Sequence, residues 1–125
     1  MENIYESNAR RFTDVLRNRL GERLHAVVLY GSVARGTASA DSDVDLLVLM
    51  DGETASDLSG DVAYDIDFAT QFRTFLTPIE FSVEQFAHCL SIGDPFCDRV
   101  LEEGKILYDD GTLKGLSERI AATRA

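Results

Sequence analysis

Two short polar groups in the first half of the chain have the residue types and spacing for phosphate and metal chemistry. The first is Gly31 followed by Ser32, directly after the apolar run 25–30. A glycine lets the backbone approach a ligand closely, and a serine that begins a turn or helix adds a hydroxyl to free amides that favour phosphate oxygens. These two residues therefore indicate a cradle for a triphosphate.

The second group is Asp43 and Asp45, at the start of the apolar run that ends at Met50. Residues two apart in a strand share a face, so both carboxylates should point the same way. Neighbouring carboxylates repel each other, and a bound divalent cation relieves that repulsion. The pair therefore predicts a Mg²⁺ site.

Other ligand motifs fit this segment poorly. Asp41, Asp43 and Asp45 imitate the start of an EF-hand, but leucine stands at the sixth position of that loop and glycine at the twelfth. A calcium loop needs glycine and a bidentate glutamate there. The glycines at 31 and 36 match neither the dinucleotide fingerprint nor the phosphate loop, whose lysine is absent. Each polar group alone would be an ordinary turn or helix cap, whereas the two together, each tied to a strand, favour a ligand site.

The elements that must position these residues follow from the spacing of the apolar side chains. Spacings of three and four indicate helices, and short β-branched runs indicate buried strands. Pro78 lacks a backbone donor, which confines its strand to an edge or a bulge. The expected order is helix 4–20, strand 25–30, strand 43–50, helix 61–73, strand 75–81, helix 82–90, helix 94–104, strand 106–108 and a last helix from about 112.

The composition indicates one acidic domain over residues 1–125. The chain has 22 Asp and Glu against 12 Lys and Arg, which argues against a surface for DNA or RNA. No run is long and apolar enough for a membrane span, and the start lacks a secretory apolar stretch, so we expect a cytoplasmic protein without a membrane partner. Cys89 and Cys97 have no metal-binding spacing, and we expect packed thiols. The oligomeric state, homo-oligomers included, stays open.

Gly31-Ser32, ten further residues and Asp43-Val44-Asp45 together resemble the signature of minimal nucleotidyltransferases of the DNA polymerase β superfamily. Arg35 and Ser42 stand where that family often has the same residues, and 76–82 and 103–108 resemble its later segments more loosely. The resemblance implies an α/β (α+β) fold like the polymerase β palm, a mixed sheet flanked by helices. It also implies ATP or another triphosphate as donor and two Mg²⁺ ions held by three carboxylates.

The third of these carboxylates is where the sequence departs from the family. Alignment by residues 82–86 puts Thr77 at its position, and Glu80 is the only carboxylate in the strand 75–81. Glu80 has the opposite parity, so only a bulge at Pro78 would turn it toward the two aspartates. We expect the regular strand.

Four further titratable residues indicate no catalytic role, and a fifth, Arg35, stays open. Asp65 and Asp67 lie in the expected helix and are interpreted as surface charges. His25 and His88 lie in apolar elements and are interpreted as core or surface residues. Arg35 allows two interpretations, a partner for the γ-phosphate or a solvated side chain.

The resemblance supports three functions. The first is Mg²⁺-dependent transfer of a nucleotide, AMP from ATP, to a hydroxyl of a protein or small molecule. The alternative is a catalytically weak, nucleotide-binding antitoxin that neutralises a helical HEPN-type ribonuclease by binding it. Adenylylation of an antibiotic ranks last, because the chain ends before the helical domain that normally holds such an acceptor. The sequence fixes neither the acceptor nor the nucleotide base.

Overall fold

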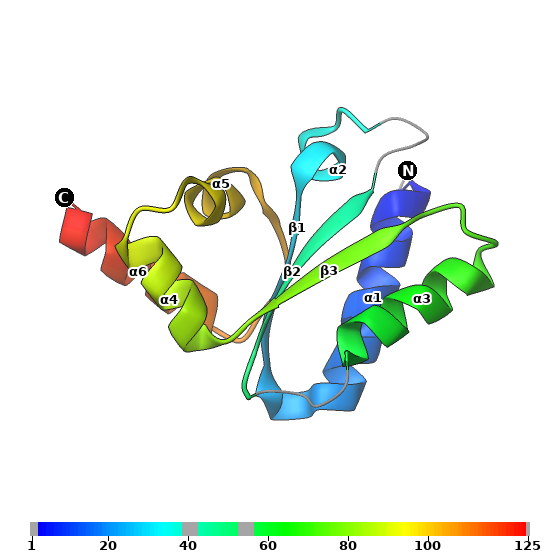
Figure 1. Ribbon diagram of the computed structural model, residues 1–125, viewed down its shortest axis with the longest axis horizontal. Helices are drawn as coiled ribbons and strands as arrows, with labels where there is room; N and C mark the ends of the chain where they lie inside the picture. The colour runs from blue at the N-terminus through cyan, green and yellow to red at the C-terminus, as the bar shows by residue number, and fades with distance from the viewer. Residues whose placement is uncertain (1–2, 39–42, 53–56, 125) are drawn as a thin grey trace.

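The computed structural model describes residues 3–38, 43–52 and 57–124, which are organised around a four-stranded sheet (Figure 1). The strands lie in the order β3-β2-β1-β4. They are β1 (Leu24–Tyr30), β2 (Val44–Met50), β3 (Leu76–Phe81) and β4 (Lys105–Asp109). β1 is antiparallel to β2 and β4, whereas β2 and β3 are parallel. The sheet is therefore mixed, and the strand with Pro78 lies at its edge, as predicted.

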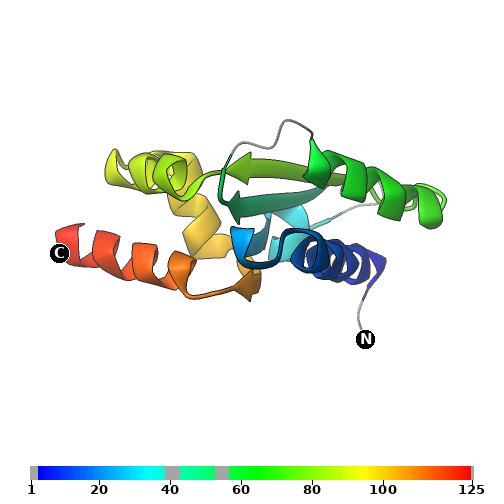
Figure 2. The same cartoon turned by 90° about the horizontal axis from the view of Figure 1, so that it is seen from below.

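Helices cover both faces of the sheet (Figures 1 and 2). α1 and α3 pack on one face, α4, α5 and α6 pack on the other, and the short η1 and α2 flank β1. The helices are α1 (Ile4–Leu20), η1 (Gly21–Arg23), α2 (Gly31–Arg35), α3 (Leu58–Ala69), α4 (Val83–Ser91), α5 (Pro95–Glu103) and α6 (Thr112–Arg124). The expected fold class is confirmed. No described helix is long and apolar enough to cross a membrane.

The two central strands are apolar on both sides because each side faces its own core. Leu46 and Val48 pack with α1 and α3, while Leu47 and Leu49 pack with α4, α5 and α6. All four side chains are fully buried. Burial of one such side chain stabilises the fold by roughly 1.5–3 kcal/mol. The two strands therefore hold Gly31, directly after β1, and Asp45, near the start of β2, in fixed positions.

The third helix begins and ends earlier than its apolar spacing predicts. It starts at the Asp57 cap, whose side chain accepts from the Gly60 amide, and it ends at Ala69. The chain then turns through Gln71 and Phe72, which have φ angles of 58° and 56°. A helix cannot continue through left-handed backbone, so the apolar Phe72 lies outside α3.

Asp67 is not the surface charge that the sequence predicts. Its side chain is buried and accepts hydrogen bonds from Thr74 Oγ1 at 2.7 Å and from the Leu76 amide at 3.0 Å. Burial raises the pKa of Asp67, and these two hydrogen bonds lower it by less. The carboxylate thus holds the turn between α3 and β3, whereas Asp65 is exposed as expected.

Replacing Asp67 with alanine should lower the free energy of unfolding by about 2 kcal/mol, because the Leu76 amide would be left buried without its partner. Chemical denaturation measures this loss. Asp65→Ala, on the exposed side of the same helix, is the matched control and should change stability by less than about 0.5 kcal/mol. Equal effects of the two substitutions would contradict the structural role of Asp67.

The two cysteines form a disulfide, so the expectation of packed thiols is wrong. Cys89 lies in α4 and Cys97 in α5, and their Cα atoms are 6.3 Å apart. The short connection between two helices on the same face of the sheet brings them together. A separation of eight residues gave no sign of this pairing, because it depends on how α4 and α5 pack.

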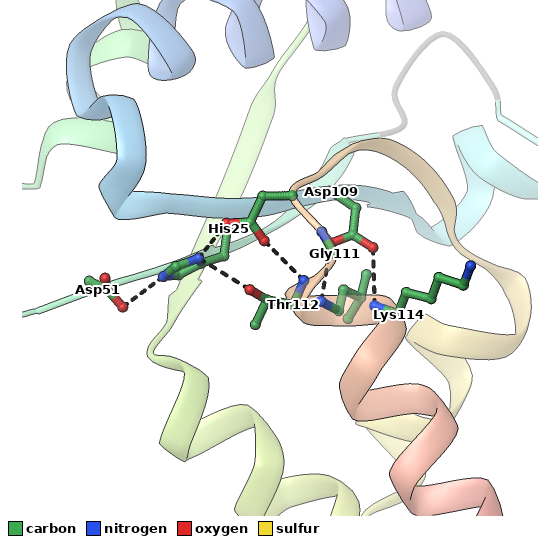
Figure 3. Close-up of polar contacts among 8 residues, drawn as sticks. His25, Asp51, Asp109, Gly111, Thr112 and Lys114 are labelled. Carbon is green, nitrogen blue, oxygen red and sulfur yellow. Dashed lines mark hydrogen bonds and ion pairs between the residues drawn. The ribbon is translucent and has the colours of Figure 1, made fainter.

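His25 joins three segments at the end of the sheet where β1 begins (Figure 3). Its Nε2 lies 2.7 Å from Asp51 Oδ1, and its Nδ1 lies 2.7 Å from Asp110 Oδ2. Burial lowers the pKa of His25, but the hydrogen bonds and charges of Asp110 and Asp51 outweigh it and leave the pKa raised from 6.5. His25 is thus a partly buried residue that ties β1 to the segments of Asp51 and Asp110.

Replacing His25 with asparagine should cost about 1 kcal/mol of stability at mildly acid pH, and less at alkaline pH. The folded-state pKa of His25 is raised, so its contribution is complete below 6.5 and is lost as the pH rises through the folded-state value. The pKa of Asp110 is lowered from 3.8, so its contribution disappears in strong acid. Urea unfolding of both proteins between about pH 5 and pH 9 measures this. A difference independent of pH would contradict the charged bridge.

Candidate active site

The antiparallel pairing of β1 and β2 brings the two polar groups to one end of the sheet. Tyr30, the last residue of β1, pairs with Asp45 near the start of β2. Gly31 and Ser32 follow Tyr30 directly and begin α2. The structure therefore confirms that the glycine–serine pair and the aspartate pair share an end of the sheet. Ser42 lies outside the described residues.

Gly31 is in contact with Asp45. Its φ angle is +79°, and a Cβ atom added there would collide with Asp45 Oδ2. Both the backbone and the neighbouring carboxylate therefore require glycine. Gly31 was predicted to let a ligand approach the backbone, and in the structure the group that approaches it closely is the Asp45 carboxylate.

The start of α2 leaves its first backbone donors without a side-chain cap. The residue before the helix, Tyr30, is extended and makes no capping hydrogen bond. Ser32 is half-buried in the first turn, and Gly36 ends the helix in the left-handed region. Amides and a hydroxyl at this position suit phosphate oxygens when a cation shares the charge.

Asp43 and Asp45 differ in their surroundings. Asp43 is exposed, whereas Asp45 is half-buried. Burial raises the pKa of Asp45, the charge of Asp43 raises it further, and the guanidinium of Arg35 lowers it. A cation beside the pair would favour the ionised form of both carboxylates.

The donor set fits a magnesium ion that is shared with a substrate. Mg²⁺ in proteins is commonly held by one or two carboxylates together with substrate phosphates and waters. Asp43 and Asp45 supply two carboxylates. Within residues 3–38, 43–52 and 57–124, no group of three or more His, Cys, Asp or Glu side chains could hold a metal. A pair of carboxylates suits a metal whose other ligands are phosphate oxygens and waters.

β3, the strand on which a third metal-binding carboxylate would lie, is a regular strand. In its parallel pairing with β2, Thr77 lies opposite Asp45 and Glu80 lies opposite Val48, with no shift of register. Thr77 thus shares the face of Asp45, whereas Glu80 lies on the other face and accepts a hydrogen bond from Ser59 Oγ at 2.6 Å. The expectation of a regular strand, with Glu80 turned away, is confirmed.

A pocket of about 260 Å³ adjoins Gly31 and Asp45, and one wall of it is α5. Sequence reasoning missed this wall, although its residues are spaced by three and four and so share one helix face. The lining residues are Tyr30, Gly31, Arg35, Asp45, Phe96, Arg99, Val100 and Glu103. The pocket thus combines two arginines and two aromatic rings with the aspartate site.

Arg35 is not purely solvated, because it forms an exposed ion pair with Glu103. Its Nη1 lies 3.3 Å from Glu103 Oε2, and both side chains are exposed. Tyr30, which lines the pocket, has its pKa raised to about 12 by burial and by the charge of Asp45, so it stays protonated. Arginine, tyrosine and Ser32 give the site donors that suit a phosphate chain.

A larger hollow of about 430 Å³ lies at the opposite end of β2. Glu80, Ser82, Glu84 and Gln85 are among its lining residues, and no basic side chain is present in its described lining. Two carboxylates without a cation do not suit a triphosphate. The chemistry of the residues therefore places the candidate site at the end with Gly31.

Comparison with known proteins agrees with this geometry. The polymerase β nucleotidyltransferase family matches residues 12–112. Two relatives from Methanocaldococcus jannaschii are provisionally named protein adenylyltransferases. MJ0604 is 31% identical, with 82% of this chain and 97% of that protein covered, and MJ1305 is 34% identical, with 87% and 76% covered.

Solved structures show the same fold at lower identity. A chain of a toxin–antitoxin crystal structure with AMP-PNP has a TM-score of 0.61 at 18% identity, covering 92% of this chain and 86% of that chain. A tri-AMPylated Shewanella oneidensis HEPN toxin in complex with an MNT antitoxin gives 0.58 at 16% identity, covering 97% and 87%. By the family match and the two relatives, the chain belongs to the polymerase β family of nucleotidyltransferases.

Proposed function

We propose that this protein transfers AMP from ATP to a hydroxyl group of a partner protein, with Mg²⁺ held by Asp43 and Asp45. The observation that carries the proposal is the contact between the Gly31 turn and Asp45 at one end of the sheet. The names of the two relatives favour a protein as acceptor and AMP as the transferred group. ATP is abundant in the cytoplasm, and we place the reaction there.

In this reaction the acceptor oxygen forms a bond to the α-phosphorus while the bond to the bridging oxygen breaks. Pyrophosphate leaves, and the hydroxyl proton is lost to water. Bound Mg²⁺ would neutralise phosphate charge and orient the reacting groups. Gly31 and Ser32 would hold phosphate oxygens through backbone amides and a hydroxyl, and Arg35 would exchange Glu103 for a phosphate.

A second candidate is neutralisation of a HEPN-type helical partner by binding, with little catalysis. Thr77 stands opposite Asp45, where a third carboxylate would complete the metal site. The similar fold of toxin–antitoxin complexes with HEPN toxins supports such a partner. The two candidates share the nucleotide site and differ in the rate of transfer.

The experiment that tests the proposal incubates the protein with Mg²⁺, ATP labelled at the α-phosphorus and a HEPN-type helical protein as the acceptor. We expect label on the partner protein and release of pyrophosphate. Label that stays in ATP, although Mg-ATP binds, would favour the neutralising function. Absence of Mg-ATP binding would contradict both candidates.

Replacing Glu80 with glutamine should change the transfer rate by less than about tenfold, or roughly 1.4 kcal/mol in the barrier, because Glu80 faces away from Asp45. The matched variant Thr77→Asp should raise the rate, since it adds a carboxylate on the metal face. Single-turnover assays with labelled ATP measure both. A loss of more than about a hundredfold in Glu80→Gln would show that Glu80 takes part in metal binding.

A further inference from the structure

Four aromatic side chains form a continuous row on the surface beside the candidate site. They are Tyr64 and Phe68 of α3, Phe72 of the following turn and Phe75 before β3, and 40–64% of each is exposed. Neighbouring rings lie 5.7–6.4 Å apart. We call these four residues the aromatic row. Contiguous exposed apolar groups of this kind mark surfaces that bind a partner.

The backbone is held in a costly conformation that keeps this row together. Gln71 and Phe72 both have positive φ angles, which are uncommon for residues other than glycine. The Phe72 amide donates to the Asp67 carbonyl at 2.7 Å, which fixes the turn. Phe72 then contacts Phe68 on one side and Phe75 on the other. Strain of this kind commonly accompanies functional surfaces.

The open edge of β3 does not invite another strand. The Phe75 carbonyl accepts from the Val44 amide, so alternate residues after Phe75 point their main-chain groups at β2. The main-chain groups of Leu76 and Pro78 therefore point away from β2, toward the open edge of the sheet. The Leu76 amide is already bonded to Asp67, and Pro78 has no amide hydrogen. Strand addition is therefore disfavoured along Leu76–Pro78, next to the aromatic row, and the side chains of the row are the groups that a partner would contact there.

The row ends at the candidate active site. Val44, whose amide bonds the Phe75 carbonyl, lies between the two aspartates. Leu76, the residue after Phe75, pairs with Val44, so the row reaches the end of the sheet at which both aspartates lie. A chain lying on the row would have its next residues beside Asp43 and Asp45.

The charge beside the row selects the kind of chain that would bind. α3 exposes Asp61 and Asp65 and contains no lysine or arginine, whereas Arg73 is exposed between Phe72 and Phe75. An apolar segment flanked by basic side chains would complement the acidic α3 end of the row.

We propose that the aromatic row is the docking platform for the protein acceptor. It binds a segment with apolar side chains next to lysine or arginine and so places a nearby hydroxyl of that segment at Asp43 and Asp45. This inference rests on the proposed function, since it names the acceptor of the same site.

The test uses two synthetic peptides of roughly 12 residues, each with one tyrosine and the same leucines, one carrying arginines and the other glutamates. The double variant Tyr64→Ser/Phe68→Ser is compared with Ile92→Ser, which removes an equally exposed apolar side chain outside the row. Peptide affinity is measured by fluorescence anisotropy with Mg-ATP present, and label transfer is measured in parallel.

We expect the arginine peptide to bind the wild type at least about tenfold more tightly than the glutamate peptide does. The double variant should lose at least about tenfold in affinity and raise KM with little change in kcat, while Ile92→Ser behaves as wild type. Mg-ATP affinity should be the same in all three proteins.

Three results would overturn the proposal. One is equal peptide affinity in the wild type and the double variant while Mg-ATP still binds, which leaves the proposed function intact. Another is peptide binding on the row without label transfer, which removes the acceptor role. The third is a dimer, seen by sedimentation, that the double variant abolishes, which would assign the row to a second copy of the chain. Failure of Mg-ATP binding in the wild type contradicts the proposed function instead.

Discussion

Replacing both Asp43 and Asp45 with alanine should lower kcat/KM for AMP transfer by at least about a thousandfold, or roughly 4 kcal/mol in the barrier. The two carboxylates are the donor set for Mg²⁺ at the end of the sheet, and without the metal the phosphate charge is not neutralised. Stability should not fall, because the variant removes two repelling charges. The pKa of Asp45 is raised, so its ionised form opposes folding at neutral pH.

Labelled ATP measures the transfer, and urea unfolding at neutral pH measures the stability. The control Asp14→Ala/Glu22→Ala removes two exposed carboxylates from the α1 and η1 segments and keeps the net charge equal to that of the test variant. It should transfer AMP at the wild-type rate. Equal transfer by both double variants would show that the aspartate pair does not hold the catalytic metal.

The second large effect is expected from Gly31→Ala. The added Cβ meets Asp45 Oδ2, and the φ angle of +79° is unfavourable for alanine, so the carboxylate must move. We expect a loss of about 1–3 kcal/mol in stability and at least about a hundredfold in transfer.

Gly36→Ala separates the two causes of this effect. Gly36 has a similar φ angle of +75°, but an added Cβ there has no heavy atom within 4 Å. The Gly36→Ala protein should lose only the stability that the left-handed backbone costs an alanine, about 1 kcal/mol, and it should keep its affinity for Mg-ATP. Thermal unfolding and nucleotide titration of both variants check this. A Gly31→Ala protein that binds Mg-ATP as tightly as Gly36→Ala does would contradict the role of the Gly31 contact.

Much of the fold could be predicted from local patterns. The uninterrupted apolar runs of β1 and β2 predicted strands covered on both faces, and both strands are buried between two layers of helices. Ser82 and Asp94 predicted helix starts, and both cap helices in the structure. Such signals lie within a few residues of the feature they announce, so the sequence alone carries them.

The features that sequence reasoning missed depend on distant parts of the chain. Asp67 resembles a surface charge in its helix, and only the approach of Thr74 and Leu76 makes it a buried acceptor. Phe72 fits the helical spacing, yet it lies in the turn after α3.

The candidate site divides in the same way. The proximity of Gly31 and Asp45 could be predicted, because both motifs stand at strand ends. The antiparallel pairing of β1 and β2 brings these two ends together. Its wall, with Arg99 and Glu103, could not be predicted, since the packing of α5 on the sheet brings it there. The ion pair between Arg35 and Glu103 is a consequence of that packing.

A calorimetric titration of ATP, with and without Mg²⁺, tests the central claim most directly. The wild-type protein should bind ATP with Mg²⁺ present and lose that binding when the metal is chelated. The Asp43→Ala/Asp45→Ala protein should show no Mg²⁺-dependent binding while its circular dichroism stays that of the wild type. The same Mg-ATP affinity in both proteins would contradict a nucleotide and metal site at this end of the sheet.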